Sequence, residues 1–210
     1  MLTGVYEPTE GTVSLEVDGQ LKKLKRTRTL QAYKPRMART FQNIRLFKDL
    51  TVLENVMIAM HAHSSDSLFS TLFRTKKYYD TEAKMREEAV ELLKIFNLDT
   101  LKDEKAKNLA YGQQRELEIV RALATKPKIL FLDEPAAGMN PQETAQLTEL
   151  IAKIQAEFDL TVVLIEHDMS LVMKICQRIY VLEYGRLLAE GTPEEIKQNP
   201  AVIKAYLGGE

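Results

Sequence analysis

The sequence predicts an α/β domain built around a parallel β-sheet. Two short apolar runs, at 129–132 and 161–165, have the length and composition of strands that are covered on both faces. A helix with clear start signals lies between them, because Asn140 is a good N-cap, Pro141 takes the first helical position and Glu143 completes a capping box. Strand, helix and strand in this order form a βαβ unit, which indicates parallel pairing.

Antiparallel strands are expected towards both ends of the chain. Residues 12–17 (TVSLEV) alternate in polarity and precede Asp18-Gly19, a typical hairpin turn. We therefore expect the first forty residues to form short antiparallel strands. Residues 179–182 and 186–189 are apolar-rich runs separated by a short turn, and they predict a second strand pair.

Further helices are indicated by apolar spacing and by caps. Residues 81–96 place their apolar side chains on one helical face, and Ser64–Ser70 forms a polar stretch that is typical of a loop. Asp168 is expected to cap a helix that begins at Met169, and Thr192 opens a capping box.

Composition excludes several classes of protein. The chain has 210 residues, a net charge of −1 and 45% hydrophobic residues, which excludes a disordered chain. Its single cysteine excludes an intrachain disulfide framework, and no apolar run approaches the length of a membrane span. The start of the chain shows no secretory signal pattern. We expect a cytoplasmic protein that can still dock on a membrane partner.

A basic stretch lies between residues 22 and 48, where ten Lys and Arg residues occur without an acidic one. Such a stretch could bind a polyanion. A solvated surface is the favoured interpretation, because aromatic residues are sparse here and no nucleic-acid motif accompanies the charge.

The strongest local motif is 129–135 (ILFLDEP), in which Asp133 and Glu134 follow a buried strand. Ligands of open α/β sheets bind at the carboxyl ends of the strands. One carboxylate can hold Mg²⁺ while the next polarises a water, and phosphoryl transfer needs both functions. Taken alone, the pattern is equally compatible with an acidic turn before a proline.

Three weaker motifs accompany it. In 109–115 (LAYGQQR), Gly112 lies at the mouth of a helix whose N-terminus suits an anion. His167 follows the strand 161–165, and Gln42 follows a short strand near residue 40. In isolation, each of these is more often a structural residue than a functional one.

The order of the motifs resembles the ATP-binding subunits of ABC transporters. Gln42 matches the Q-loop, 109–113 the signature motif, 129–134 the Walker B segment, 137–140 the D-loop and His167 the switch histidine. Segments such as FQNIRLF, LAYGQQR and LDEPAAGMNP are similar to the branch that serves branched-chain amino-acid uptake. The resemblance implies a P-loop NTPase-like (RecA-like) parallel sheet core with an antiparallel β edge and a helical subdomain, incomplete at the N-terminus.

The resemblance assigns a role to each matching residue. Asp133 would position Mg²⁺, Glu134 would be the general base, and His167 would bind the γ-phosphate of ATP. Gln42 would contact the metal or the attacking water. The nucleotide held by a second subunit would meet Leu109, Ala110, Tyr111, Gly112, Gln113 and Asn140.

Two departures from the family pattern concern charge and hydroxyl groups. Ala110 stands where the common signature has a serine, and Tyr111 stands where it has a glycine. Asn140 stands near a D-loop position that is usually an aspartate. We expect these exchanges to weaken contact with the phosphates without abolishing it.

A third departure is the phosphate-binding loop G-x-x-x-x-G-K-[ST], which none of the nine glycines forms. The beginning of the chain resembles the segment that follows this loop in the family, so we expect a truncated chain. It would bind ATP poorly alone and would be marginally stable, because strands next to a missing central strand keep unpaired backbone groups.

The family further implies an organisation and a set of partners. Residues 1–42 and 116–210 would form the α/β core, and 43–115 the helical subdomain. Two ATPase subunits, alike or different, would dock on membrane permease subunits at the inner face of the membrane, served indirectly by a substrate-binding protein, with no nucleic acid. One alternative is a non-catalytic module that pairs with an intact homologue or permease. An ABC-type ATPase of DNA repair is disfavoured, because no long coiled-coil insertion interrupts the chain.

Overall fold

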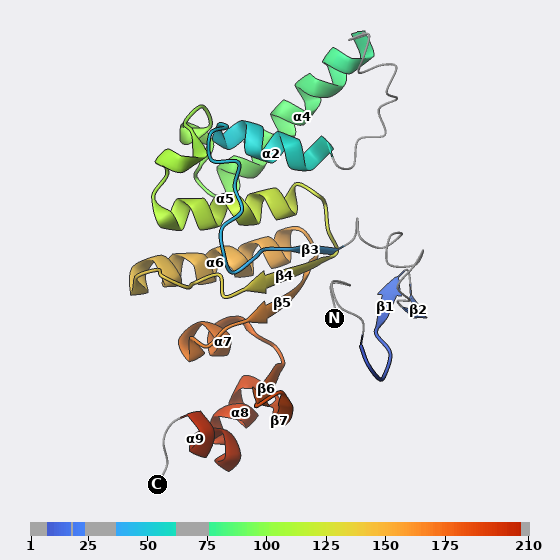
Figure 1. The fold of residues 1–210 in the computed structure, drawn as a ribbon, viewed down its shortest axis with the longest axis vertical. Helices are drawn as coiled ribbons and strands as arrows, with labels where there is room; N and C mark the ends of the chain where they lie inside the picture. Colours follow the sequence, from blue (N-terminus) through green and yellow to red (C-terminus); the bar gives the residue numbers. More distant parts are fainter. Residues whose placement is uncertain (1–7, 18, 24–36, 62–75, 207–210) are drawn as a thin grey trace.

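The computed structural model describes residues 8–17, 19–23, 37–61 and 76–206 (Figure 1). The strands are β1 Ser14–Val17, β2 Gln20–Lys23, β3 Met37–Arg39, β4 Ile129–Asp133, β5 Thr161–Ile165, β6 Ile179–Glu183 and β7 Arg186–Gly191. The α-helices are α2 Val52–His61, α4 Lys76–Ile95, α5 Tyr111–Leu123, α6 Pro141–Glu157, α7 Met169–Ile175, α8 Pro193–Gln198 and α9 Pro200–Tyr206. Two short 3₁₀ turns, Asp99–Leu101 and Ala106–Asn108, lie between α4 and α5.

Strands β3, β4 and β5 form a parallel sheet in that order. Strand β4 pairs in parallel with β5 from Ile129↔Thr161 to Asp133↔Ile165, and α6 connects the two. The predicted βαβ unit is therefore confirmed. Strand β3 also pairs in parallel with β4, so the expectation that the first forty residues form only antiparallel strands was wrong for this strand. A three-residue strand is too short for its period to reveal its partner.

The two predicted antiparallel pairs are present. Strands β1 and β2 form one antiparallel hairpin, and β6 and β7 form another. Among the described residues, β5 pairs only with β4 and β6 only with β7. The second edge of each strand therefore has no strand partner in the described part of the chain.

The start signals of three helices act as expected. The side-chain oxygen of Asn140 accepts hydrogen bonds from the backbone of Gln142 and Glu143 at the start of α6. Asp168 caps α7, and Thr192 caps α8. Helix α4 begins five residues before the predicted position, and the Ser64–Ser70 loop lies outside the described residues.

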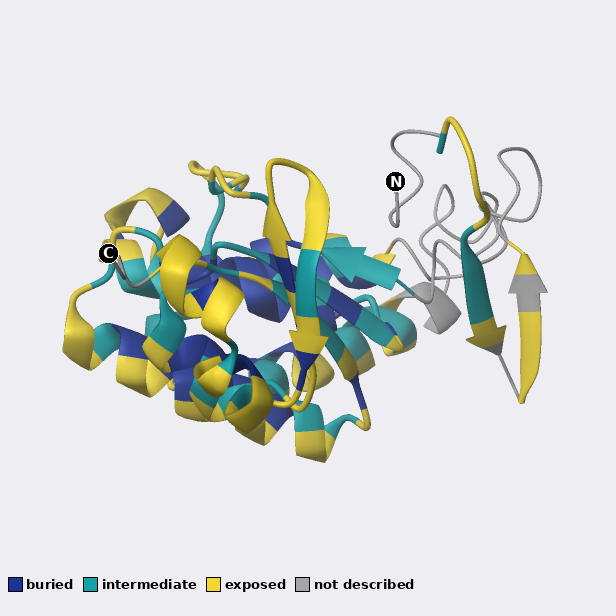
Figure 2. Ribbon diagram, turned by 90° about the horizontal axis from the view of Figure 1, so that it is seen from below, coloured by how far each residue is buried: buried dark blue, intermediate teal, exposed yellow. Residues whose placement is uncertain are grey.

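Helix α5 lies between the sheet and a helical group made of α2 and α4 (Figure 1). Its side chains Leu117, Val120 and Leu123 are buried in the main core, which continues into Leu130 and Leu132 of β4. Figure 2 shows that the buried residues lie mostly in the interior between helices and strands, while the outer faces of the helices are largely exposed. One rigid helix thus joins the helical group to the edge of the sheet where the site lies.

Candidate functional site

Two carboxylates stand where β4 ends. The Oδ2 atom of Asp133 lies 2.7 Å from Nη2 of Arg39, at the end of the neighbouring strand β3. Glu134 has a φ of 47°, in the left-handed region that costs a residue with a Cβ atom about 1–2 kcal/mol. Its backbone N–H donates to the carbonyl of Ile165 at 2.9 Å. Strained backbone of this kind gathers at functional sites, where the surrounding structure holds it in place.

The residues predicted to act with Glu134 converge on it from neighbouring strands. Nε2 of Gln42 donates a hydrogen bond of 2.7 Å to one carboxylate oxygen of Glu134, and Nδ1 of His167 lies 3.8 Å from the other. The three residues follow β3, β4 and β5, which is why residues up to 125 positions apart in sequence meet. The His167 side chain is 75% exposed, so its ring is open to a ligand.

The sequence did not single out Glu166, although it supports this cluster. Its side chain is only 1% exposed. One oxygen accepts the N–H of Ala136 at 3.0 Å, and the other accepts those of His167 and Asp168 at 3.0 and 3.4 Å. Glu166 therefore ties the loop after β4 to the loop after β5. A single buried acid next to a histidine leaves no pattern in the sequence. The role of Glu166 can therefore be seen only from its contacts in the structure.

The predicted signature segment forms the start of α5. Ala110 is the N-cap residue, and its side chain has no oxygen to cap the helix. Oε1 of Gln113 accepts the N–H of Ala110 at 3.1 Å, and the Gln114 amide donates to the carbonyl of Leu109 at 2.9 Å. The free N–H groups of the first turn keep the positive end of the helix dipole available to an anion.

The start of α5 contacts the loop that leads into α6. A Cβ atom on Gly138, where φ is 80°, would lie 3.2 Å from the Tyr111 ring. A Cβ atom on Gly112 would lie 3.4 Å from the Glu143 carboxylate. The structure thus brings the predicted signature and D-loop segments together, while the oxygen of Asn140 is used to cap α6.

Glu116, one turn into α5, has a pKa above the usual range of a glutamate. Burial, together with the negative charge of Glu143, raises its pKa to about 6. Helix α5 therefore carries, just after the signature segment, a carboxyl group that gains or loses its proton at a pH of about 6.

Asp133 and Gln42 supply the oxygen atoms that suit Mg²⁺. Magnesium is commonly held by one or two carboxylates together with substrate phosphates. Since Gln42 directs its amide nitrogen at Glu134, its oxygen remains free to bind a cation. Within the described residues, no three His, Cys, Asp or Glu side chains lie close enough together to hold a metal ion by themselves.

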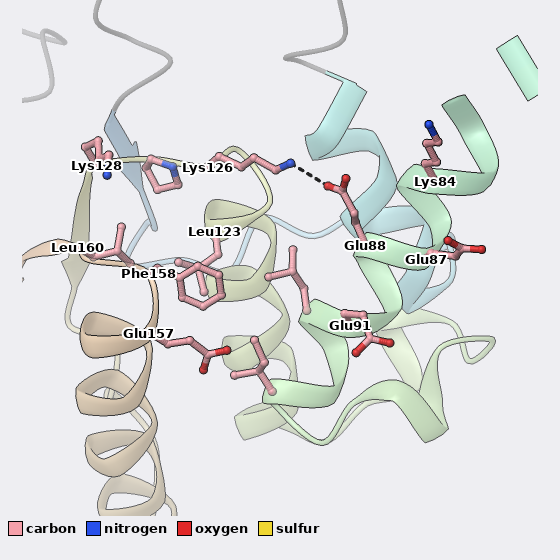
Figure 3. A pocket seen from close by; sticks show the side chains of 13 residues that line it. Lys84, Glu87, Glu88, Glu91, Leu123, Lys126, Lys128, Glu157, Phe158 and Leu160 are labelled. Carbon is pink, nitrogen blue, oxygen red and sulfur yellow. Dashed lines mark hydrogen bonds and ion pairs between the residues drawn. The ribbon is translucent and has the colours of Figure 1, made fainter. Parts of the chain in front are cut away.

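A cavity of about 660 Å³ lies elsewhere (Figure 3). Its apolar floor includes Leu123 and Phe158, and an ion pair of 2.8 Å between Lys126 and Glu88 crosses its rim. The cavity lies beside Lys128 and so at the amino ends of the strands. It contains none of the predicted site residues, which gather at the carboxyl ends.

An acid with two polar partners at the ends of parallel strands, together with a helix N-terminus, is an arrangement that suits phosphoryl transfer. Comparison with known proteins makes this specific. The family model described as "ABC transporter" matches residues 1–137, and the chain belongs to this family, whose members couple ATP hydrolysis to transport. A second model, "Branched-chain amino acid ATP-binding cassette transporter", matches residues 186–210. In the described part of the chain, no helix combines the length and apolarity that crossing a membrane requires.

Curated relatives match almost the whole chain. The branched-chain amino acid transport ATP-binding protein BraF of Pseudomonas aeruginosa is 47% identical over 207 residues, which are 99% of this chain and 80% of the relative. LivG of Escherichia coli is also 47% identical with the same coverage. The shared length includes every predicted site residue.

Solved structures share the fold. The ADP conformation of MJ1267, an ATP-binding cassette of an ABC transporter, superposes with a TM-score of 0.78 at 31% identity, over 99% of this chain and 81% of that one. A dimeric post-hydrolysis state of the cassette MJ0796, bound to ADP and phosphate, has a TM-score of 0.70 at 25% identity, over 91% and 77%. The predicted P-loop NTPase-like fold is confirmed.

Proposed function

We propose that the chain is the ATP-hydrolysing subunit of an importer for branched-chain amino acids. The observation that carries the activity is the convergence of Gln42 and His167 on Glu134 at the carboxyl ends of three parallel strands. The substrate class is supported by the names of the relatives and by the family model at residues 186–210.

In this proposal Glu134 is the general base. It draws a proton from the water that attacks the γ-phosphate, and the amide of Gln42 holds its carboxylate in position. His167 donates a hydrogen bond to the γ-phosphate from its exposed ring. Asp133 and the Gln42 oxygen would hold Mg²⁺, which neutralises phosphate charge when it is bound.

The start of α5 serves a second nucleotide. Ala110, Tyr111, Gly112 and Gln113 would present backbone N–H groups and the helix dipole to the ATP that a second ATPase subunit holds. Support comes from the dimeric structure of a related cassette. The assembled subunits would dock on a membrane permease at the cytoplasmic face, and a substrate-binding protein would deliver the amino acid.

ATP hydrolysis by the assembled transporter tests this proposal. We expect hydrolysis to depend on Mg²⁺ and to rise when leucine, isoleucine or valine is supplied with the substrate-binding protein. Stimulation by methionine, with none by these three amino acids, would contradict the proposed substrate class. A transporter that imports without hydrolysing ATP would contradict the activity.

A second candidate function rests on the start of α5. Gly112 and Gln113 lie in the first turn of this helix, where backbone N–H groups and the helix dipole suit an anion. In this candidate the chain is a non-catalytic module that pairs with an intact homologue and contributes only Gly112 and Gln113 across the interface. Loss of transport on Gly112→Asp but not on Glu134→Gln would favour this candidate over the first.

A further inference from the structure

Helix α5 holds the loop that carries Gln42 through the side chain of Glu118. This carboxylate is 7% exposed, and its Oε1 atom lies 3.4 Å from the backbone nitrogens of both Phe41 and Arg45, whose N–H groups it accepts. These two donors flank Gln42 in the chain. One buried oxygen therefore fixes the backbone on both sides of the predicted catalytic glutamine.

Two arginines of the same helix bind the carbonyl groups of the same two residues. Arg115 donates from Nη1 to the carbonyl of Phe41 at 3.2 Å, and Arg121 donates from Nη1 to the carbonyl of Arg45. Both backbone polar groups of Phe41 and both of Arg45 are thus bonded to side chains of α5. We call Arg115, Glu118 and Arg121 the α5 clamp.

Ring contacts and a second helix complete the hold on this loop. The Arg45 guanidinium lies 4.1 Å from the centre of the Phe41 ring, and that of Arg121 lies 5.0 Å from the centre of the Phe47 ring. Asn55 of α2, which is fully buried, bonds both the N–H and the carbonyl of Phe47 at 3.0 Å. The loop from Phe41 to Phe47 is therefore bonded to both α5 and α2.

Burying a carboxylate is unfavourable, because removing its charge from water costs free energy that only polar partners recover. In Glu118 those partners are two backbone donors and the nearby Arg115, whose Nη1 lies 3.9 Å from Oε2. An apolar residue on this face of α5 would fill the volume but would leave the N–H groups of Phe41 and Arg45 unpaired. These contacts therefore favour the interpretation that Glu118 positions the loop that carries Gln42.

We propose that Glu118, with Arg115 and Arg121, is the positioning residue that sets Gln42 against Glu134. Because α5 begins with the signature segment, the clamp makes that segment and the Gln42 loop parts of one body. A shift at the helix start, where the nucleotide of the second subunit would bind, is then carried directly to the bond between Gln42 and Glu134. This inference rests on the proposed function for its effect on ATP hydrolysis.

Amide hydrogen exchange of the 210-residue chain tests the clamp without nucleotide. In Glu118→Ala, we expect the amides of Phe41 and Arg45 to exchange about tenfold faster, the factor that corresponds to one lost hydrogen bond of ordinary strength. Glu118→Gln keeps an acceptor oxygen, so it should restore part of the protection. Ile119→Val, on the same helix, is the matched control, since it removes buried volume without touching the clamp.

A second measurement distinguishes a positioning role of Glu118 from a contribution to stability alone. In the assembled transporter, Glu118→Ala should lower kcat about tenfold or more and change KM for ATP much less, because the bond from Gln42 positions the general base Glu134. Glu118→Gln should recover part of kcat, and Ile119→Val should retain it.

Unchanged exchange at Phe41 and Arg45 in Glu118→Ala would overturn the inference, and so would faster exchange with an unchanged kcat. Exchange that rises equally in Ile119→Val would also overturn it, since loss of stability would then explain the effect. A wild-type transporter that hydrolyses no ATP would refute the proposed function instead, and exchange alone would then decide whether α5 fixes the loop.

Discussion

The strand-end cluster (Gln42, Glu134 and His167) and the start of α5 (110–113) are organised in different ways. The strand-end cluster is organised by side chains, since Gln42 holds Glu134 at 2.7 Å and Glu166 ties the neighbouring loops. The start of α5 offers mainly backbone N–H groups, and the only side-chain oxygen that caps its N-terminal residue comes from Gln113. The first region depends on residue identity, whereas the second depends on helix geometry.

This difference predicts different responses to substitution. A conservative change in the strand-end cluster should remove activity and leave stability almost intact. A change at the start of α5 should alter stability or affinity in small steps, because a helix N-terminus persists when side chains change.

The largest expected effect concerns ATP affinity, which neither region is built to provide alone. A phosphate-binding loop contributes at least four hydrogen bonds to charged groups, worth about 6 kcal/mol or more in total, which is over four orders of magnitude in affinity. The 210-residue chain lacks this pattern. Calorimetry of the chain with Mg-ATP should therefore detect no micromolar binding, and a micromolar dissociation constant would contradict this expectation.

Glu134→Gln should produce the next largest effect. The amide keeps the shape and the bond to Gln42 but cannot accept a proton, so kcat in the assembled transporter should fall about 10²–10⁴-fold. ATP affinity and thermal stability should not change. Glu149→Gln, an exposed change on α6, is the control, and undiminished hydrolysis in Glu134→Gln would refute the role of general base.

Gly138→Ala probes the contact between the D-loop and the start of α5. Its φ of 80° disfavours alanine, and the new Cβ would lie 3.2 Å from Tyr111. We expect a loss of about 1–2 kcal/mol in the free energy of unfolding, measured by denaturant titration. Gly185→Ala has a similar φ of 76° with nothing within 4 Å, so it isolates the backbone strain. Equal losses in both variants would mean that the Tyr111 contact carries no cost.

Glu116→Gln should make stability less dependent on pH. The pKa of Glu116 is about 6 in the folded chain against an ordinary value of 4.5, so the folded state retains the proton to a higher pH. Stability then falls as the pH rises through this window, and the full penalty is present at pH 7. After allowance for solvent screening, the variant should gain about 1 kcal/mol at pH 7.

Below pH 4 both states are protonated at this position, so the gain of Glu116→Gln should disappear there. Thermal melts at several pH values measure it. A gain that is constant across pH would show that Glu143 and burial do not set the titration of Glu116.

The smallest effect is expected from Ala110→Ser. The structure places Ala110 at the N-cap position, where a serine hydroxyl would accept the N–H of Gln113 and add about 0.5–1 kcal/mol to stability. Ala110→Val, which adds volume without an acceptor, is the comparison. If serine and valine change the melting temperature equally, capping is not the cause.

The sequence predicted the elements whose signals are local. The apolar strands β4 and β5, and the helix starts at Asn140, Asp168 and Thr192, follow from residue pattern and caps alone. Strand β3 was expected to be antiparallel because three residues carry no period and its partner β4 lies about ninety residues further along the chain.

In the candidate site, too, the sequence predicted some residues and missed others. Motif order identified Gln42, Glu134 and His167, and the structure brings them together. Glu118 and Glu166 were not singled out, because each acts through backbone N–H groups of distant segments. A contact of this kind leaves no pattern in the spacing of residue types.

The backbone of Glu134 has a consequence for how this chain can change. Glycine adopts a φ of 47° without the cost that glutamate bears, so Glu134→Gly should fold more favourably while it removes the acid. Selection for thermal stability alone would therefore favour replacement of Glu134 by glycine, with loss of the acid. Persistence of an acid here in laboratory evolution would report that hydrolysis, and not folding, is under selection.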